Sequence, residues 1–476
     1  MADKRALAKI GARAVGGVVG IGVAVLAVAG ATLLPLPSVA IDVPASTVHP
    51  VPADQQRVCP GPVLALAADA AQASRPAALG TPTVGYGTDG PDVQTRNLKP
   101  DADTSSADQA PLALTVSTPQ GATEPPLFAG AQLQDAVSED LAGLAASACL
   151  EPSADSWLVA GSTSLGQTSL VLLSNPTSVD ATVSLTVYTE TGMADAPGGT
   201  GITVPAGAQK VVPLAGLAPA VTASVVHVQT TGGQVVATLQ QSFEQGIQPY
   251  GVEQTGATGS PSRVQRIAGV TIATLAAVTA GQSAESVGVD FPAVRILVPG
   301  QEDAQVTIGA VGENGTAAGN SYAQTIKAGN VAEVPLGNLK DGSYTVTVNS
   351  SVPVVAAVRT SVIGQKARDF AWFASSPGLN DRQLVAVPSG PSPVLHFANA
   401  GEKDAPVTVT PETGKPFTVT VPAEGGANHA VPPGNYTIEG AKGLAASVSF
   451  AGAGLTSSFA LEPPGPLAAP IEVYPR

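Results

Sequence analysis

Apolar and polar residues alternate one by one over long stretches of this chain, as in residues 181–193, 304–316 and 405–415. Alternation with a period of two and one apolar face is the pattern of a half-buried antiparallel strand. One such sheet cannot bury its apolar face alone, so two sheets have to stack. The pattern therefore predicts an all-β protein whose sheets pack face to face.

The alternating segments recur in the same order in three units. In each unit a short apolar strand is followed by an alternating strand that ends in Glu-Thr-Gly or Glu-Asn-Gly, a further strand that ends at Val-Pro, and a final pair of strands. About seven short strands in ~100 residues is typical of an immunoglobulin-like sandwich. We therefore expect three tandem immunoglobulin-like β-sandwich domains, at residues 151–255, 264–366 and 367–462.

The break inside the final strand pair differs among the three units. We expect it at Gly232-Gly233 in the first unit, at residues 350–353 (Ser-Ser-Val-Pro) in the second and at Lys442-Gly443 in the third. Gly and Pro are the residues that most often interrupt a strand, which is why the breaks are placed there.

Residues 42–150 lack this alternation and are rich in X-Pro pairs, which favour extended backbone. We expect this region to be irregular and to pack on the first sandwich. Within it, the spacing of apolar residues over residues 132–150 predicts a short helix. Its apolar side would carry Leu133, Val137, Leu141 and Leu144. Residues 463–476 form a Pro-rich tail.

The N-terminus has basic residues followed by an uncharged apolar stretch over residues 15–34. A helix needs about 20 apolar residues to cross the hydrocarbon of a bilayer, so we predict a transmembrane helix at residues 15–36. The basic residues all lie before this stretch, which places residues 1–14 in the cytoplasm and the bulk of the chain outside the cell membrane.

A cleaved signal peptide is the alternative to this single-pass anchor. Ser38-Val39-Ala40 has the small residues that a signal peptidase requires, and cleavage near Ala40 would release a secreted protein. Signal-peptide apolar cores usually run about 7–15 residues, however, and this one is longer. Its length favours the retained anchor.

The composition argues against one class of partner and supports the predicted strands. The chain has 476 residues, a net charge of −14 and only 12% charged residues. An acidic chain with few Lys and Arg binds a phosphate backbone poorly, so we expect no nucleic-acid partner. With 52 glycines and 42 prolines the chain is rich in turn formers. That richness fits many short strands joined by tight turns.

Cys59 and Cys149 are the two cysteines of the chain. Outside the cell an even pair indicates one disulfide, and two free thiols are the alternative. The disulfide would close a loop of about 90 residues, worth roughly 4–5 kcal/mol in the chain-entropy model. Two cysteines do not supply the four ligands of a structural zinc site.

Motifs that would carry chemistry are weak. Residues 85–90 match G-x-G-x-x-G, but Pro91 follows where a dinucleotide site needs a helix, so we interpret them as a glycine turn. Residues 410–414 (Thr-Pro-Glu-Thr-Gly) resemble a sorting signal. They occupy the place of Tyr188–Gly192 in the first unit, which makes them a hairpin turn of the repeat.

The titratable residues show no catalytic or metal-binding spacing either. No histidine stands at the spacing of a zinc site, and no G-x-S-x-G motif occurs. Asp101, Asp103 and Asp108 could bind Ca²⁺ weakly, but a solvated acidic loop is the better interpretation. We therefore predict no catalytic, cofactor-binding or metal-binding residue, and no cofactor.

One family resemblance rests on the Trp-led strands, the Asn175-Pro176 and Asn399-Ala400 turns, the Val-Cys-Pro-Gly segment at residues 58–61 and the Trp soon after Cys149. These features resemble a family of actinobacterial proteins of unknown function with one N-terminal membrane segment and an all-β exterior. The resemblance implies a place in the cell envelope, in some cases with genes near envelope glycosyltransferases. The family has no assigned catalytic residues.

These features together favour a non-catalytic envelope protein that acts as a scaffold or accessory partner of a membrane or cell-wall component. An envelope glycosyltransferase is one candidate partner. An array of sandwiches that binds a cell-wall polymer is the alternative, and it needs exposed aromatic side chains. The candidates are Trp157, Trp372, Tyr86, Tyr188 and Tyr250. A hydrolase with an unrecognised site is the third hypothesis.

Overall fold

The computed structural model describes most of the chain as strands. The described residues are 46–48, 54–66, 76–122, 124–139, 141–246, 248–280, 290–315, 319–337, 339–365, 367–464 and 471–473. The predicted transmembrane helix and the cleavage site at Ala40 lie outside them. Among the described residues, no helix has the length and apolarity needed to span a membrane.

The chain divides into two compact units, residues 1–50 with 469–476, and residues 51–468. In the first unit, β1 (Ser46–Val48) pairs antiparallel with β34 (Ile471–Val473), with Ser46 opposite Val473. The Pro-rich tail therefore contains a short strand. The following paragraphs concern the second unit.

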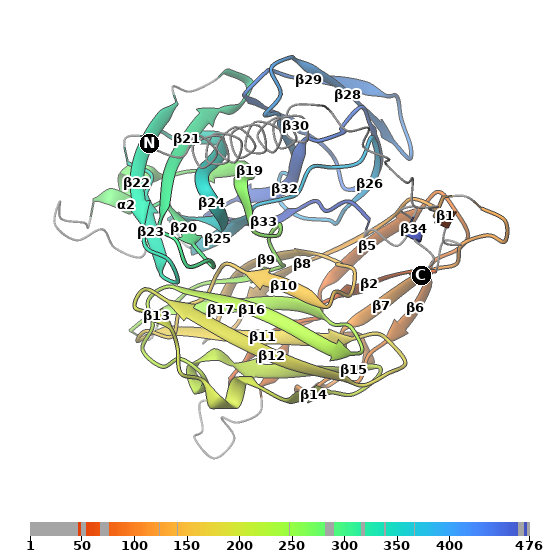
Figure 1. Cartoon of the computed structure of the whole chain (residues 1–476), viewed down its shortest axis with the longest axis horizontal. Coiled ribbons are helices and arrows are strands. Elements are labelled where there is room, and N and C mark those ends of the chain that lie inside the picture. Colours follow the sequence, from red (N-terminus) through yellow and green to blue (C-terminus); the bar gives the residue numbers. More distant parts are fainter. Residues whose placement is uncertain are drawn as a thin grey trace, which may run out of the picture. The chain divides into compact units, whose positions relative to one another are not determined.

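The first sandwich stacks two antiparallel sheets, shown in yellow to lime green in Figure 1. One sheet has the order β10-β16-β12-β13, with β14 also paired to β12, and the other has the order β15-β11-β17-β18. Alternation places Val183, Leu185 and Val187 of β12 in the core. The bounds are β10 Asp155–Leu158, β11 Gln167–Asn175, β12 Ala181–Thr189, β13 Gly192–Met193, β14 Ile202–Val204, β15 Ala208–Pro213, β16 Ser224–Gly232, β17 Val236–Gln245 and β18 Gln248–Thr255.

The second repeat unit forms one seven-stranded sheet that curls into a half-barrel around its own core, and we keep the name second sandwich for it. Its order is β22-β21-β24-β20-β23, and both β19 and β25 also pair with β24. The bounds are β19 Ser262–Ile272, α2 Leu275–Thr279, β20 Ala293–Leu297, β21 Ala304–Gly312, β22 Asn320–Ile326, β23 Val331–Pro335, β24 Gly342–Ile363 and β25 Arg368–Ala374.

The break expected at residues 350–353 is wrong, because β24 is one continuous strand of 22 residues. Its first half pairs with β19 and β21, and its second half pairs with β20 and β25. The register of β19 shifts opposite these residues, between Ser262 and Val264. Pro353 therefore lies at an irregularity, where the ladder does not need its missing N–H.

The third repeat unit again forms a sandwich of two four-stranded sheets, with orders β26-β31-β28-β29 and β30-β27-β32-β33. The hairpin turn expected at residues 410–414 is present between β28 and β29, where it spans residues 412–416. The bounds are β26 Arg382–Val387, β27 Val394–Ala398, β28 Ala405–Pro411, β29 Phe417–Val421, β30 Gly426–Ala430, β31 Gly434–Glu439, β32 Ala445–Gly452 and β33 Leu455–Ala460.

The region before the first sandwich, which was expected to be irregular, is built from short sheets with orders β2-β7-β6, β3-β4 and β5-β8-β9. The bounds are β2 Gln55–Cys59, β3 Val63–Ala65, β4 Ala77–Leu79, β5 Thr83–Thr88, β6 Gln94–Asn97, β7 Leu112–Val116, β8 Phe128–Val137 and β9 Ala142–Ala148. Four single 3₁₀ turns complete the described structure: Ala107–Gln109, Pro197–Gly199, Leu214–Gly216 and Glu313–Gly315. We call the described part of residues 54–150 the N-terminal module.

The helix predicted over residues 132–150 is wrong, because these residues form the β8–β9 hairpin. Val137, which the helix would have buried, is 83% exposed at the tip of the hairpin, whereas Leu133 and Leu144 are buried. The predicted disulfide is confirmed. Cys59 at the end of β2 is bonded to Cys149 just after β9, and both residues are fully buried.

Candidate functional site

Four strands from four different modules meet around a common axis. β9 of the N-terminal module packs beside β18 of the first sandwich, β18 beside β25 of the second, β25 beside β33 of the third, and β33 beside β9. Each is the second strand of a hairpin, and none pairs with its neighbour in the ring. One edge of each strand therefore needs hydrogen-bond partners other than a strand.

The side chain of Asp369, on β25, supplies those partners. Its carboxylate accepts the backbone N–H groups of Leu144, Phe370 and Thr456 at 2.9–3.0 Å, and also that of Val252. These four donors come from β9, β25, β33 and β18, so one carboxyl group bonds all four strands. Asp369 is fully buried.

A second buried carboxyl group, Glu253 of β18, lies beside Asp369. It accepts hydrogen bonds from the Ser457 hydroxyl at 2.8 and 3.0 Å and from the Gln254 N–H at 3.0 Å. The Ser457 hydroxyl in turn accepts the N–H of Ala146 of β9 at 2.7 Å. Burial raises the pKa of both carboxyl groups well above the usual range, although their N–H and O–H donors act in the opposite direction.

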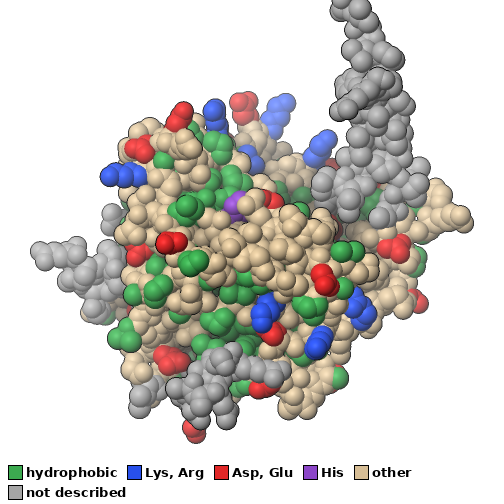
Figure 2. All heavy atoms as spheres, turned by 60° about the horizontal axis from the view of Figure 1, so that its bottom comes forward, with side chains coloured by type: hydrophobic (Ala, Val, Ile, Leu, Met, Phe, Trp, Pro, Cys, Tyr) green, Lys and Arg blue, Asp and Glu red, His purple; other side chains and the backbone are tan. Residues whose placement is uncertain are grey.

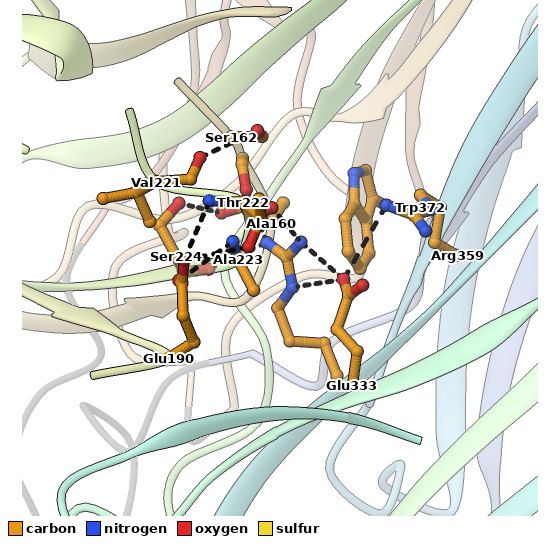
Figure 3. Close-up of polar contacts among 12 residues, drawn as sticks. Ala160, Ser162, Glu190, Val221, Thr222, Ala223, Ser224, Glu333, Arg359 and Trp372 are labelled. Carbon is orange, nitrogen blue, oxygen red and sulfur yellow. Dashed lines mark hydrogen bonds and ion pairs between the residues drawn. The ribbon is translucent and has the colours of Figure 1, made fainter. Parts of the chain in front are cut away.

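A fully buried guanidinium joins the first and second sandwiches. Arg295 of β20 donates to the carbonyls of Gly161 and Ser224, both in the first sandwich, at 2.6 and 3.0 Å. Two of its N–H groups also donate to one oxygen of the Glu333 carboxylate, at 2.6 and 3.0 Å. The guanidinium stacks on the Trp372 ring, 4.5 Å from the ring centre. In Figure 3 a dashed line also joins the Glu333 carboxylate to Arg359, which lies 3.7 Å from it.

The electrostatics of this junction favour the ionised pair. Burial alone would raise the pKa of Glu333, but the charges of Arg295 and Arg359 lower it by more. The indole N–H of Trp372 donates to the Gln241 side chain of the first sandwich at 2.8 Å. The indole ring of Trp372 also belongs to the apolar core of the first sandwich. Polar and apolar contacts therefore together hold the first and second sandwiches.

The second and third sandwiches meet at a buried chain of polar groups. The Glu313 carboxylate lies 2.6 Å from Nδ1 of His396, and Nε2 of His396 lies 2.7 Å from the hydroxyl of Ser449. Glu313 also accepts the N–H of Gly269 at 2.9 Å and the side-chain amide of Asn428 at 2.8 Å. Glu313 comes from the second sandwich, whereas His396, Asn428 and Ser449 come from the third.

The order Ser449–His396–Glu313 is that of a serine-hydrolase triad. A triad needs an open space beside its nucleophile and donors aimed at the developing oxyanion. Ser449 is only 4% exposed, and His396 and Glu313 are fully buried. The hydrogen bonds of these three side chains join the second and third sandwiches.

The hairpin glutamates of the three repeat units lie at or beside contacts with the next module. Glu190, Glu313 and Glu412 each directly follow the third strand of their unit, β12, β21 or β28. The carbonyl of Glu190 accepts the side chain of Asn330 from the second sandwich at 2.9 Å, and Glu313 binds the third sandwich. Sequence reasoning treated these residues only as turns. The recurrence of Glu at one position of the repeat was the signal that could have marked them as contacts.

Asn435, beside Glu412, joins the third sandwich to the N-terminal module. The side-chain amide of Asn435 donates both to Glu412 at 3.0 Å and to the carbonyl of Tyr86 in β5 at 3.2 Å. A Cβ at Gly87 would lie 2.6 Å from the Asn435 amide, so this close approach requires glycine. Gly85 and Gly87 lie in β5, so the glycine turn expected at residues 85–90 is wrong for residues 85–88, and the bend begins only at Asp89.

Two larger hollows open on this part of the chain. A groove of about 590 Å³ separates the N-terminal module from the third sandwich; six of its lining residues are Tyr86, Thr88, Asp92, Glu412, Asn435 and Thr437. A hollow of about 560 Å³ is lined by the segments that connect successive modules, near residues 150–157, 257–266, 376–378 and 462–464. Burial raises the pKa of Glu462 there to about 7.

The candidate aromatic residues differ in exposure. Trp157, Trp372 and Tyr250 are 6%, 1% and 2% exposed, and Tyr188 is half-buried. Tyr86, at 40%, is the exposed aromatic side chain of the five, and it lines the 590 Å³ groove.

The remaining candidate residues make structural contacts. His227 stacks on Trp157 at 3.8 Å and lies 2.8 Å from the Asp155 carboxylate, and His429 stacks on Phe417. Asp101 forms an ion pair with Lys210 at 2.9 Å. Among the described residues no group of three or more His, Cys, Asp or Glu is placed to hold a metal ion.

A family model described as a family of unknown function, DUF5719, matches residues 102–434. The chain belongs to this family. No curated protein matches its sequence. One solved structure, described as the crystal structure of Thermotoga maritima 1070, aligns with a TM-score of 0.20 and 18% identity over 24% of this chain and 93% of that one.

The DUF5719 match begins inside the N-terminal module and ends at Gly434, the first residue of β31 in the third sandwich. It therefore includes four of the acidic residues described above: Asp369, Glu253, Glu313 and Glu412.

Proposed function

We propose that this chain is a non-catalytic protein of the cell envelope, anchored by residues 15–36, that acts as a scaffold for a membrane-embedded or cell-wall component. The observation that supports the proposal most is the use of its buried ionisable side chains. These side chains all bond groups within or between modules. They are Asp369, Glu253, Arg295, Glu313 and His396. Such contacts make one cohesive body rather than an open reaction site.

The surface is consistent with this role. On the face drawn in Figure 2, Lys, Arg, Asp and Glu side chains lie scattered among small uncharged ones, without a broad patch of one sign. A membrane-embedded partner fits best, because an anchored chain and such a partner would both be confined to the plane of the membrane. The family resemblance makes an envelope glycosyltransferase one candidate.

Affinity capture with an anchor control tests the proposal. The full chain would be expressed in its source organism and purified with its partners in mild detergent. A control protein would carry residues 1–41 fused to an unrelated β-sandwich. We expect at least one membrane or cell-wall protein to be enriched with the full chain over this control. If the two captured sets are the same, the exterior binds no such partner and the scaffold role is contradicted.

A covalent probe tests the hydrolase alternative separately. A fluorophosphonate labels an activated serine, and the Ser449–His396–Glu313 order is the reason to test it. We expect no labelling of the folded chain, because Ser449 is buried. Labelling that disappears in Ser449→Ala would contradict the non-catalytic proposal.

A further inference from the structure

The groove between the N-terminal module and the third sandwich combines an exposed ring with many small polar groups. Its volume of about 590 Å³ lies within the usual range of ligand sites, about 300–1,000 Å³. Tyr86 offers 40% of its surface to solvent. Thr88, Thr410 and Thr437 supply hydroxyl groups, and Asp92 and Glu412 supply carboxylates.

The walls of the groove are held in place by contacts between the two modules. Asn435 bonds both the Glu412 carboxylate and the backbone of β5, and Arg382 of the third sandwich pairs with Asp89 of the N-terminal module at 3.0 Å. A ligand would therefore meet groups held in position by two modules, which reduces the cost of ordering them on binding.

The chemistry of these groups selects one class of ligand. Carboxylates only accept hydrogen bonds, and threonine hydroxyls donate and accept, so the ligand should carry many hydroxyl or N–H donors. A tyrosine ring offers a flat apolar surface with a polar tip, which suits a molecule with one apolar face. The lining contains Asp89, Asp92 and Glu412 and no Lys or Arg, so a negatively charged polymer would be repelled.

We propose that this groove binds a short uncharged oligosaccharide. The Tyr86 ring packs against the apolar face of one sugar residue, and Asp92 and Glu412 accept hydrogen bonds from sugar hydroxyl groups. This inference goes beyond the scaffold role and does not depend on a membrane partner.

A panel of trisaccharides tests the proposal. The probes would be maltotriose, mannotriose and N,N′,N″-triacetylchitotriose, with the anionic trigalacturonic acid as a control. Titration calorimetry would use the full chain in a detergent without a sugar headgroup, because such a headgroup would compete. We expect at least one uncharged probe to bind and trigalacturonic acid not to bind. Failure of all three uncharged probes, or equal binding of the anionic one, would overturn the proposal.

Variants locate the binding. Tyr86→Ala should weaken association about tenfold, which is about 1.4 kcal/mol. Tyr86→Phe should keep most of the affinity, because it keeps the ring that packs against the sugar. Asp92→Asn should weaken binding as well, whereas the exposed Asp195→Asn, outside the groove, should not. Binding that Tyr86→Ala leaves unchanged would overturn the proposal, as would displacement of the sugar by a lysine-rich peptide. Binding to the Phe variant separates loss of the ring from loss of the fold.

Discussion

The carboxylate of Asp369 in β25 accepts the backbone N–H of Leu144 in β9, at 2.9 Å and across 225 positions of sequence. The same carboxyl group receives N–H donors from β18 and β33. A single side chain therefore satisfies strand edges of the N-terminal module and of all three repeat units. In an open sheet these edges would face water or another chain.

Asp369→Asn should destabilise the protein by about 2–4 kcal/mol, because an amide presents one acceptor oxygen to a site that has four N–H donors. Urea unfolding followed by circular dichroism would measure the change, with the exposed Asp195→Asn as the control. A loss below about 0.5 kcal/mol, the usual size of a surface substitution, would show that the four strands do not depend on this carboxyl group.

Stability should also depend on pH through Glu253. Burial raises its pKa in the folded state well above the value of 4.5 in the unfolded chain. The folded state therefore binds more protons than the unfolded state above about pH 4.5, so the wild type loses stability as the pH rises towards the folded pKa. Glu253→Gln lacks this proton, and its stability relative to the wild type should increase with pH.

The slope of that difference is limited to about 1.4 kcal/mol per pH unit for one proton. Unfolding of both proteins in urea at pH 5, 6, 7 and 8 would measure it. A difference that stays constant over this range, or that falls with rising pH, would contradict a raised pKa at Glu253.

Local alternation was enough to predict strands in the three repeat units, but not in the N-terminal module, where distant segments decide the backbone. Ala181–Thr189 forms β12 as its alternation predicts, with Val183 and Leu185 inside. The helix expected over residues 132–150 failed, because the N–H of Leu144 is bonded to Asp369 of another module. No pattern within residues 132–150 contains that partner.

The contacts between modules were harder to predict for the same reason. Glu313 and His396 are 83 positions apart and meet only because two sandwiches dock. Their spacing matches no short motif. Tyr86 was one of five aromatic candidates in the sequence, and only its exposure beside the third sandwich distinguished it from Trp157 and Trp372.

Arg295→Ala should destabilise the junction of the first two sandwiches by about 3–5 kcal/mol, because it leaves the partly buried Glu333 without its closest cation and removes a partner of the Trp372 ring. Arg295→Lys should also destabilise the protein, since one ammonium cannot reproduce the pair of N–H donors to Glu333 or the stacking on Trp372. Thermal unfolding of each variant would measure these losses.

A double variant distinguishes the ion pair from general packing. Arg295→Met with Glu333→Gln removes both charges and keeps most of the volume, so it should be more stable than Arg295→Met alone. If the double variant loses as much as the sum of the single variants, the two residues are not coupled and the junction depends on shape instead.

The Cys59–Cys149 disulfide should be the largest single contribution of the N-terminal module. The bond joins residues 90 positions apart, and closing a loop of that length is worth about 4–5 kcal/mol through the unfolded chain. Cys59→Ser with Cys149→Ser should therefore unfold at a lower urea concentration than the oxidised wild type. Reduction of the wild type with dithiothreitol should give the same shift, because both treatments free the same loop.

The reduced and substituted proteins also test how closely the modules are coupled. β9 ends just before Cys149 and supplies the Leu144 donor to Asp369, so loosening it should lower the protection of the β18, β25 and β33 amides in hydrogen exchange. Dithiothreitol should leave the exchange of the double serine variant unchanged, which separates the disulfide from other effects of the reductant. Faster exchange confined to residues 54–150 would show that the N-terminal module opens alone and that the stability of β18, β25 and β33 does not depend on it.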